Sequence, residues 1–231
     1  MTASIRLLST LAVMGAMRDL SAAYQARTGR SVEPDFSPTV ALLERLLGGE
    51  KADIAILTAQ GIDDLIAEGI MRPGSRTDVA RSFIGIAVKA GAPKPDIGSL
   101  DAFKAALLAA RSVAYSRIGA SGLYFAALID RLGIAPEVNA KATIVSTGFT
   151  AERLVSGEAD LAVQQISELM VVPGIEVVGG LPPEVQTVAM FSAGLLTASE
   201  QPDAAADFVR FLASAEAEPI LKRTGLEAAS V

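Results

Sequence analysis

The stretch AYSRIGASGLYFAALIDRL, residues 114–132, has the pattern of a strand end, a turn rich in glycine and serine, and an amphipathic helix. Gly119 and Gly122 would let the backbone adopt conformations that are closed to other residues. Ser116, Ser121 and the first N–H groups of the helix would face outward, where the helix dipole places positive potential. The stretch therefore predicts either an anion-binding turn or an ordinary Ser-capped connection from strand to helix.

The same order of strand, polar turn and helix recurs along the chain. Before the central stretch, apolar runs at 5–8, 31–36 and 53–57 each precede a helical pattern, and after it the runs at 142–145 and 161–165 end in polar residues. Alternation of this kind predicts the α/β class, with a parallel sheet covered by helices on both faces. Ligands of such sheets bind at the carboxyl ends of the strands.

Polar side chains cluster where these expected strands end, and they form the candidate ligand-binding set. The set is Ser9, Thr10, Ser37, Thr39, Ser116, Arg117, Ser121, Gly122, Tyr124, Gln164 and Gln165. For the hydroxyl side chains the alternative role is helix capping, and Ser37 with Pro38 at the first helical position is the expected cap of the helix that follows.

Other members of the set have different alternatives. Arg117 either pairs with a carboxylate of the ligand or forms a surface ion pair. Tyr124 either contacts the ligand or belongs to the core. Gln164 and Gln165 alternate along one strand, so only one of them is expected to face the ligand.

Glu168 is the single acidic residue in these turns and is therefore the candidate catalytic base. Its alternative role is structural, because a glutamate in the first turn of a helix interacts favourably with the helix dipole.

Two extended segments, near residues 81–89 and 186–196, are long enough to leave one lobe and enter another. The helices after residue 201 have no strand of their own, so we expect them to pack on the first lobe. The expected domains are lobe I, residues 1–83 with 187–231, and lobe II, residues 84–186.

The composition excludes several kinds of chemistry. Among 231 residues there is no Cys and no His, and the net charge is −6 with no basic run. A Ser-His-Asp triad and thiol chemistry are therefore impossible, and we expect no metal, no cofactor and no nucleic-acid partner. A phosphate loop of the GxxxxGK[ST] form is also absent from the sequence.

Residues 1–17 have features of a weak signal peptide, with the single charge of Arg6 before an apolar run. Because residues 5–8 are the natural first strand, we interpret the segment as structural and favour a cytoplasmic protein, with a periplasmic location as the alternative if the native form is secreted. No apolar run approaches the roughly 20 residues that span a bilayer, so we expect no membrane insertion.

Six segments together carry a family resemblance over most of the chain: residues 5–10, AMRDL (16–20), KADIAIL (51–57), IGASGLY (118–124), SGEADLAVQQISEL (156–169) and AADFVRFLASAEAEPILKRTGLE (205–227). Through them the chain resembles the type II periplasmic-binding fold, and within it the molybdate-binding-protein-like group of bacterial solute-binding proteins. The resemblance implies two lobes joined by two crossing strands, a small anion bound in the cleft between them, and an ABC transporter as partner only if the protein is exported.

The chain departs from this group at positions that bear on the ligand. The group's serine near the first helix corresponds to Ala12, and its tyrosine after the GEAD strand is replaced by Gln164 and Gln165. With Arg117 in the turn, an organic carboxylate is expected rather than a tetrahedral oxyanion.

Three alternatives to simple carboxylate binding stay open. The aconitate isomerase branch of the resemblance implies an isomerase that moves a proton along an unsaturated polycarboxylate. The other two are molybdate-type oxyanion binding for transport, and a ligand-sensing module acting on a cytoplasmic partner.

Overall fold

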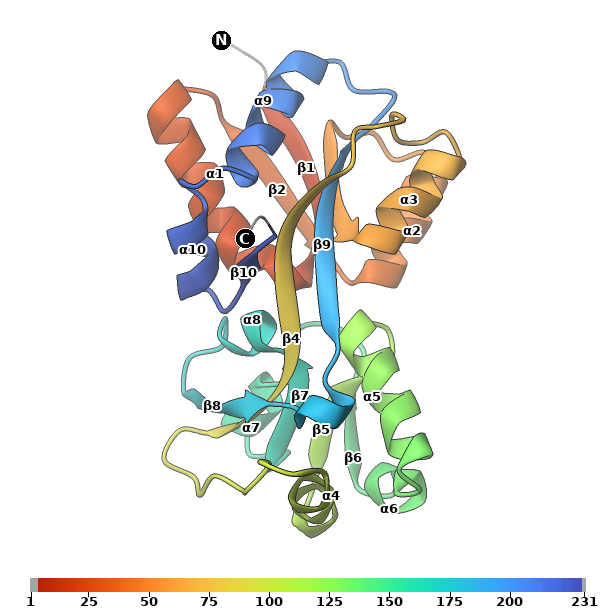
Figure 1. Ribbon diagram of the computed structural model, residues 1–231, viewed down its shortest axis with the longest axis vertical. Coiled ribbons are helices and arrows are strands. Elements are labelled where there is room, and N and C mark those ends of the chain that lie inside the picture. The colour runs from red at the N-terminus through yellow and green to blue at the C-terminus, as the bar shows by residue number, and fades with distance from the viewer. Residues whose placement is uncertain (1–3, 230–231) are drawn as a thin grey trace. The chain divides into compact units, whose positions relative to one another are not determined.

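The computed structural model describes residues 4–229, and the chain divides into two compact units. Unit 1 extends to Ser82 and resumes at Ala189, and unit 2 is Phe83–Val188. The chain passes from one unit to the other through strands β4 (Thr77–Lys89) and β9 (Val188–Leu195), drawn in yellow and light blue in Figure 1. That the two units are separate domains with the expected boundaries stays a prediction.

Unit 1 is built on strands paired in the order β2-β1-β3-β9. Strand β1 is Ile5–Thr10, β2 is Val32–Ser37 and β3 is Ile54–Thr58. β1 is parallel to both β2 and β3, whereas β3 is antiparallel to β9. The C-terminal segment does contribute a strand, contrary to expectation: the two-residue β10 (Glu227–Ala228) pairs with β4.

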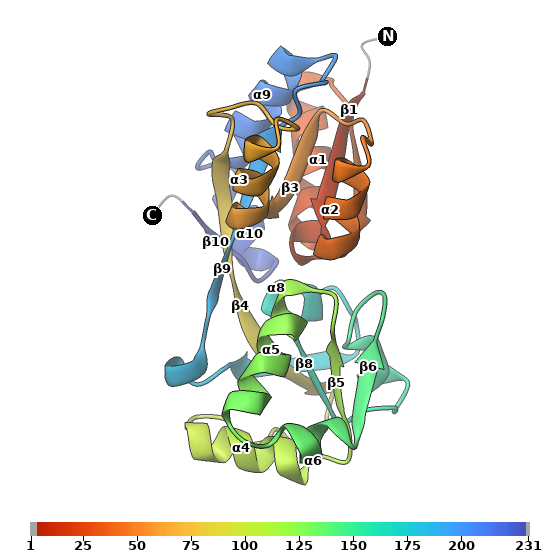
Figure 2. The same ribbon diagram turned by 90° about the vertical axis from the view of Figure 1, so that its right-hand side faces the viewer.

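Helices cover both faces of the unit 1 sheet, as expected for an α/β fold (Figures 1 and 2). One face packs against α1, α9 and α10 through residues such as Leu7, Tyr24 and Phe208. The other packs against α2 and α3 through residues such as Leu8 and Leu42. The helices are the 3₁₀ turn η1 (Leu11–Val13), α1 (Met14–Thr28), α2 (Thr39–Leu47), α3 (Ala59–Ala67), α9 (Pro202–Leu212) and α10 (Glu218–Arg223).

Unit 2 contains strands paired in the order β4-β7-β5-β6, with β8 also paired to β4. The strands are β5 (Val113–Ser116), β6 (Ala142–Val145), β7 (Leu161–Gln165) and β8 (Ile175–Gly180). β5 is parallel to β6 and β7, and β4 is antiparallel to β7 and β8. Unit 2 therefore has its own parallel strands, whose carboxyl ends share one edge.

Two apolar clusters hold the helices of unit 2 against its strands. The larger contains Tyr115 and Phe125, whose rings meet edge-on at 5.1 Å, and joins α4, α5 and α6 to the strands. The smaller contains Ala114 and Leu154 and joins α7 and α8 to the opposite side. The helices are α4 (Leu100–Ala109), α5 (Ala120–Arg131), α6 (Ala135–Asn139), α7 (Glu152–Val155), α8 (Ile166–Leu169) and the 3₁₀ turn η2 (Pro183–Val185).

Local sequence signals set several helix ends. Gly29 follows α1 with a φ of 73°, a left-handed conformation that glycine adopts without strain. Ser99 caps α4, because its hydroxyl accepts a hydrogen bond from the Ala102 N–H at 3.2 Å. The expectation for α2 is wrong: Pro38, not Ser37, is the N-cap residue, and the helix begins at Thr39 without a side-chain cap.

Gly122 is required by a close approach of backbone and not by an unusual φ. A Cβ at position 122 would lie 1.8 Å from the carbonyl oxygen of Ser116, so the first turn of α5 packs directly on the end of β5. Gly119 has a φ of −100° and open space around it, so it does not need to be glycine. The expectation that both glycines adopt conformations closed to other residues is therefore wrong.

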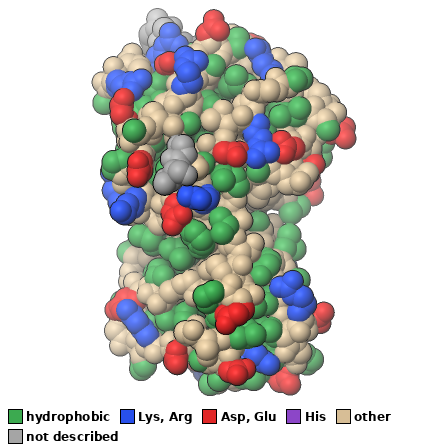
Figure 3. All heavy atoms as spheres, viewed as in Figure 1, with side chains coloured by type: hydrophobic (Ala, Val, Ile, Leu, Met, Phe, Trp, Pro, Cys, Tyr) green, Lys and Arg blue, Asp and Glu red, His purple; other side chains and the backbone are tan. Residues whose placement is uncertain are grey.

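Residues 5–17, which have features of a signal peptide, form β1, η1 and the start of α1. Leu7, Val13 and Met17 are fully buried in unit 1. Within residues 4–229, none of the helices combines the length and the apolar character needed to cross a bilayer. On the face shown in Figure 3, basic side chains lie among acidic ones and do not gather into one patch.

We predict that Gly122→Ala destabilises the protein by roughly 3 kcal/mol or more, because the methyl group can be accommodated only if α5 moves away from β5. Gly119→Ala is the matched control in the same turn and should change the free energy of unfolding by less than about 1 kcal/mol. Urea unfolding followed by circular dichroism measures both. Equal effects of the two substitutions would contradict this account of the turn.

Candidate functional site

The carboxyl ends of the three parallel strands of unit 1 bring hydroxyl side chains to one edge of its sheet. Thr10 and Ser37 are paired residues of β1 and β2, and Thr58 ends β3. The chain continues from these strands into η1 and α1, α2, and α3 respectively. Since the first N–H groups of helices lack partners within the helix, this edge combines hydroxyl donors with backbone donors.

Thr10 and Thr39 meet at this edge. Their Oγ1 atoms are 3.3 Å apart, and Thr10 is buried whereas Thr39 is partly exposed. The Thr10 side chain makes no capping bond to η1. Ser9 is fully buried and donates to the Thr10 carbonyl at 3.2 Å. The structure therefore brings together Thr10 and Thr39, with Ser9 behind them.

Ser37 has a structural partner. Its Oγ accepts a hydrogen bond from Arg45 Nη1 at 2.6 Å, and the same guanidinium is bound by Glu50 at 2.6 Å and by Asp35. The Arg45 guanidinium lowers the pKa of the Glu50 carboxyl. Ser37 thus stabilises the contact between β2 and α2.

Thr58 was not expected from the sequence. Its side chain caps α3 by accepting the Gly61 N–H at 3.2 Å, and it lies at the same edge as Thr10. The signal that could have found it is the order of a buried strand, a threonine and a helical pattern, which it shares with the Thr10 position.

In unit 2 the corresponding edge is formed by the ends of β5 and β7. Ser116 ends β5 and Gln165 ends β7, and the two strands are parallel. The Ser116 hydroxyl accepts the Ile118 N–H at 3.2 Å and so shapes the turn into α5. The turn and the start of α8 are therefore on the same edge of the unit 2 strands.

Ser121 is the hydroxyl of this edge that lacks a structural partner. Its side chain is in the first turn of α5 and is only 4% exposed, yet it forms no hydrogen bond within the described part of the chain. The Oγ atom itself is not fully enclosed, so a solvent or ligand atom can reach it. Ser121 is therefore better suited to a ligand than to a role in folding.

Arg117 carries a positive charge without an acidic partner. Its guanidinium lies against the Tyr115 ring, donates to the Tyr115 hydroxyl at 3.1 Å and to Asn139 Oδ1 at 3.2 Å. Among residues 4–229, no carboxylate comes within 4.0 Å of its nitrogen atoms. The surface ion pair considered for Arg117 is thus not formed, and its binding role stays a prediction.

Tyr124 is committed to packing within unit 2. Its hydroxyl donates to the Val185 carbonyl at 2.8 Å, and the Arg131 guanidinium stacks over its ring at 5.5 Å. These contacts favour the core role that the sequence left open.

The two glutamines of β7 are both buried but have different surroundings. Gln164 Oε1 accepts from the Thr150 N–H at 2.8 Å and from the Thr150 hydroxyl at 3.0 Å. Gln165 Oε1 is buried and faces the backbone N–H of Glu168 in a capping box at the start of α8, but it forms no full hydrogen bond with the described residues. Gln165 is therefore the one with spare hydrogen-bonding capacity.

Glu168 lies in α8 directly after these glutamines and is 7% exposed. Its Oε2 accepts the backbone N–H of Gln165 at 3.3 Å, which is the structural role considered above. Burial raises the pKa of the Glu168 carboxyl to about 7, although hydrogen bonds from Gln165 and Gln164 oppose the shift. A carboxyl with such a pKa can both accept and donate a proton near neutrality.

The chain is similar to known proteins in both its sequence and its fold. A model of the family described as "Bacterial extracellular solute-binding protein" matches residues 5–227. The chain belongs to this family. The resemblance to molybdate-binding-like proteins of the type II periplasmic-binding fold is thereby confirmed, as is the α/β fold class.

Individual relatives support the same assignment. The chain is 36% identical over 230 residues to an aconitate isomerase from a Pseudomonas species, covering 97% of this chain and 87% of the relative. The periplasmic molybdate-binding protein of Azotobacter vinelandii superposes with a TM-score of 0.82 at 18% identity, covering 96% and 98% of the two chains. A sulfate-binding protein from Mycobacterium tuberculosis gives 0.74 at 16% identity, covering 99% and 88%.

Within residues 4–229, no group of three His, Cys, Asp or Glu side chains is arranged to hold a metal ion. The identity of the ligand and the binding role of the candidate residues stay predictions.

The titration of Glu168 can be detected in protein stability. The pKa is raised from 4.5 to about 7, so between these values the unfolded chain loses its proton while the folded protein keeps it. The free energy of unfolding should therefore fall by about 3 kcal/mol as the pH rises from about 4.5 to 7, and Glu168→Gln should remove that fall.

Urea unfolding of both proteins at a series of pH values measures the difference. Glu168→Gln also removes a capping contact, which shifts the free energy of unfolding by a constant amount. That constant cancels when the change with pH is compared between the two proteins. Glu137→Gln, an exposed acid in the first turn of α6, should follow the wild type. Parallel curves for wild type and Glu168→Gln would show that the pKa of Glu168 is the same in the folded and the unfolded protein, which would contradict the prediction.

Proposed function

We propose that this protein binds a small organic anion with more than one carboxylate group. The observation that carries the proposal is Arg117, an exposed guanidinium without an acidic partner next to the turn into α5. A guanidinium pairs with a carboxylate through two parallel hydrogen bonds, which is a stronger and more directional contact than neutral donors provide.

Neutral donors would complete the recognition of such an anion. Ser121 in unit 2 and Thr10 and Thr39 in unit 1 hold hydroxyl groups at strand ends, close to the starts of helices. In this proposal such hydroxyl groups would add neutral donors to the single guanidinium of Arg117.

The relatives support an anion but not one particular anion. The molybdate-binding and sulfate-binding proteins share the fold at under 25% identity, whereas the more similar relative is named for aconitate, a tricarboxylate. Ala12 stands where the molybdate-binding-like group is expected to carry a serine, and Gln164 and Gln165 stand where it is expected to carry a tyrosine, which favours the carboxylate.

We expect trans-aconitate or another tricarboxylate to raise the melting temperature, and molybdate and sulfate to have little effect. A ligand at one hundred times its dissociation constant stabilises the folded protein by about 2.7 kcal/mol. Arg117→Gln should raise the dissociation constant roughly tenfold to a hundredfold, because a hydrogen bond to a charged group contributes about 1.5–3 kcal/mol. Isothermal titration calorimetry measures the change.

Arg131→Gln is the matched control, since Arg131 lies at the far end of the same helix α5 and is exposed. It should bind the tricarboxylate as the wild type does. Tight binding of molybdate together with no binding of any carboxylate would overturn the proposal.

A second candidate function is isomerisation of the bound anion. Two observations favour it: the Glu168 carboxyl has a pKa of about 7, and the relative at 36% identity is an aconitate isomerase. In the absence of His and Cys, a buried carboxyl is the group in the candidate set that is suited to take a proton from carbon.

The reaction requires a single group that acts first as base and then as acid. Ionised Glu168 would take one proton from the CH₂ carbon beside the double bond, and the electron pair of that C–H bond would be delocalised over the three-carbon unit and its carboxylates. Glu168 would then deliver a proton to the other end of that unit, which shifts the double bond. Exchange of the Glu168 proton with solvent before this second transfer would carry deuterium into the product in deuterium oxide. No oxidant, reductant or cofactor is consumed.

We expect the protein to interconvert cis- and trans-aconitate, and to exchange deuterium into the product in deuterium oxide. Glu168→Gln should lower the rate at least about a hundredfold, the lower range expected for a general base, while leaving tricarboxylate binding in place. Proton NMR follows both substrates.

Glu137→Gln serves again as the control and should keep full activity. If the wild type binds aconitate without turnover or exchange, catalysis is rejected and the binding function stands.

The family is described as extracellular, and the expected cytoplasmic location stays a prediction; a transporter partner follows only for an exported form.

A further inference from the structure

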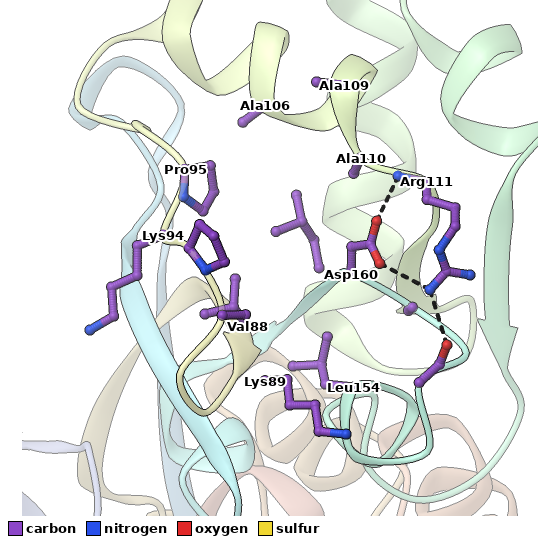
Figure 4. A pocket seen from close by; sticks show the side chains of 15 residues that line it. Val88, Lys89, Lys94, Pro95, Ala106, Ala109, Ala110, Arg111, Leu154 and Asp160 are labelled. Atoms are coloured by element: carbon purple, nitrogen blue, oxygen red, sulfur yellow. Dashed lines mark hydrogen bonds and ion pairs between the residues drawn. The ribbon is translucent and has the colours of Figure 1, made fainter.

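Unit 2 contains a pocket of about 600 Å³ (Figure 4). It is lined by the end of β4, the loop after it, the C-terminal part of α4, Leu154 of α7, and residues just before β5 and at the start of β7. The unit 2 members of the candidate set lie at or after the carboxyl ends of β5 and β7, so the two features lie at opposite ends of the same strands. The length of β7 separates them by about 13 Å.

The walls of the pocket are mainly apolar. Val88, Leu154 and Leu161 form its base and are at most 4% exposed. Small side chains such as Ala106 of α4 and Ala110, the residue after it, line the pocket opposite them (Figure 4). A volume of this size with apolar walls and a few polar groups is typical of small-molecule sites.

The charges at the rim leave one positive group without a carboxylate partner. Arg111 is paired with Asp160 at 2.9 Å, and Lys94 with Glu176 at 2.8 Å. Lys89 makes a single contact, from its Nζ to the Val155 carbonyl at 3.3 Å, and has no acidic partner among residues 4–229. The positive charges of Lys89, Lys94 and Arg111 face the two negative charges of Asp160 and Glu176, so one net positive charge remains beside the apolar cavity.

We propose that this pocket is a second binding site, which takes a medium-chain monocarboxylate with its apolar chain on the Val88, Leu154 and Leu161 wall and its carboxylate at Lys89. The charge decides the class of ligand: a single unpaired cation suits one anionic group, whereas a tricarboxylate would leave two charges against an apolar wall. The apolar chain adds the free energy that an exposed lysine alone does not supply.

Octanoate is the probe, and octan-1-ol is its neutral counterpart. In a titration followed by ¹H–¹³C NMR of methyl groups, octanoate should cause saturable shifts at Val88, Ala106 and Leu161. The same shifts should occur with saturating trans-aconitate present, because this site is separate from the candidate anion site. Octan-1-ol should bind more weakly.

Two variants address the two halves of the site. Ala106→Phe should abolish octanoate binding by filling the cavity, and its melting temperature reports whether the fold is retained. Lys89→Gln should weaken binding about threefold, as expected for an exposed ion pair. Lys104→Gln, a lysine of α4 that does not line the pocket, should have no effect.

Three results would overturn the proposal: no saturable shift at millimolar octanoate, equal affinity for octan-1-ol and octanoate, or shifts confined to the turn at residues 117–122. Loss of aconitate binding in Arg117→Gln with octanoate binding retained would separate this site from the proposed function.

Discussion

Parallel pairing of short strands is the constraint on which the candidate chemistry depends. In unit 1, β1 is parallel to β2 and β3, and in unit 2, β5 is parallel to β6 and β7. A parallel strand must be followed by a crossover, so the helix after each strand starts at the same edge as its neighbours. This geometry gathers Thr10 with Thr39, and Ser121 with Gln165, although each pair is far apart in the sequence.

At these edges some polar groups are used by the fold and others are left over. Ser37, Tyr124 and Gln164 each have a partner that stabilises a local contact. Ser121 has a hydroxyl with no partner among the described residues, Arg117 has a charge with no acidic partner, and Glu168 has a carboxyl whose pKa is raised to about 7 by burial. Perturbed groups of this kind gather at functional sites more often than elsewhere, so the role of this edge in binding stays a prediction.

The sequence predicted the features that depend on local signals. β6 and β7 have the bounds expected from their apolar runs. The exceptions are side-chain contacts that depend on the packed fold. The Arg45 guanidinium donates a hydrogen bond to the Ser37 hydroxyl, and the Tyr124 hydroxyl donates one to the Val185 carbonyl, 61 residues away. Neither pairing follows from residue type or spacing. The sequence named two roles for Glu168, as a catalytic base or as a structural residue at the start of a helix. It could not decide between them, because the burial of Glu168 depends on the packed fold.

The double passage of the chain through β4 and β9 has a consequence for biosynthesis. Unit 2 is one continuous segment, Phe83–Val188, whereas unit 1 pairs Ile54 of β3 with Leu195 of β9. On the ribosome, unit 2 is therefore the first part whose contacts are all available, and the earlier 82 residues wait for their central antiparallel partner. Long-range pairing slows folding and exposes strand edges while it is incomplete. The nascent protein consequently carries an unfinished N-terminal sheet whose β3 edge is a target for chaperones until β9 has been made.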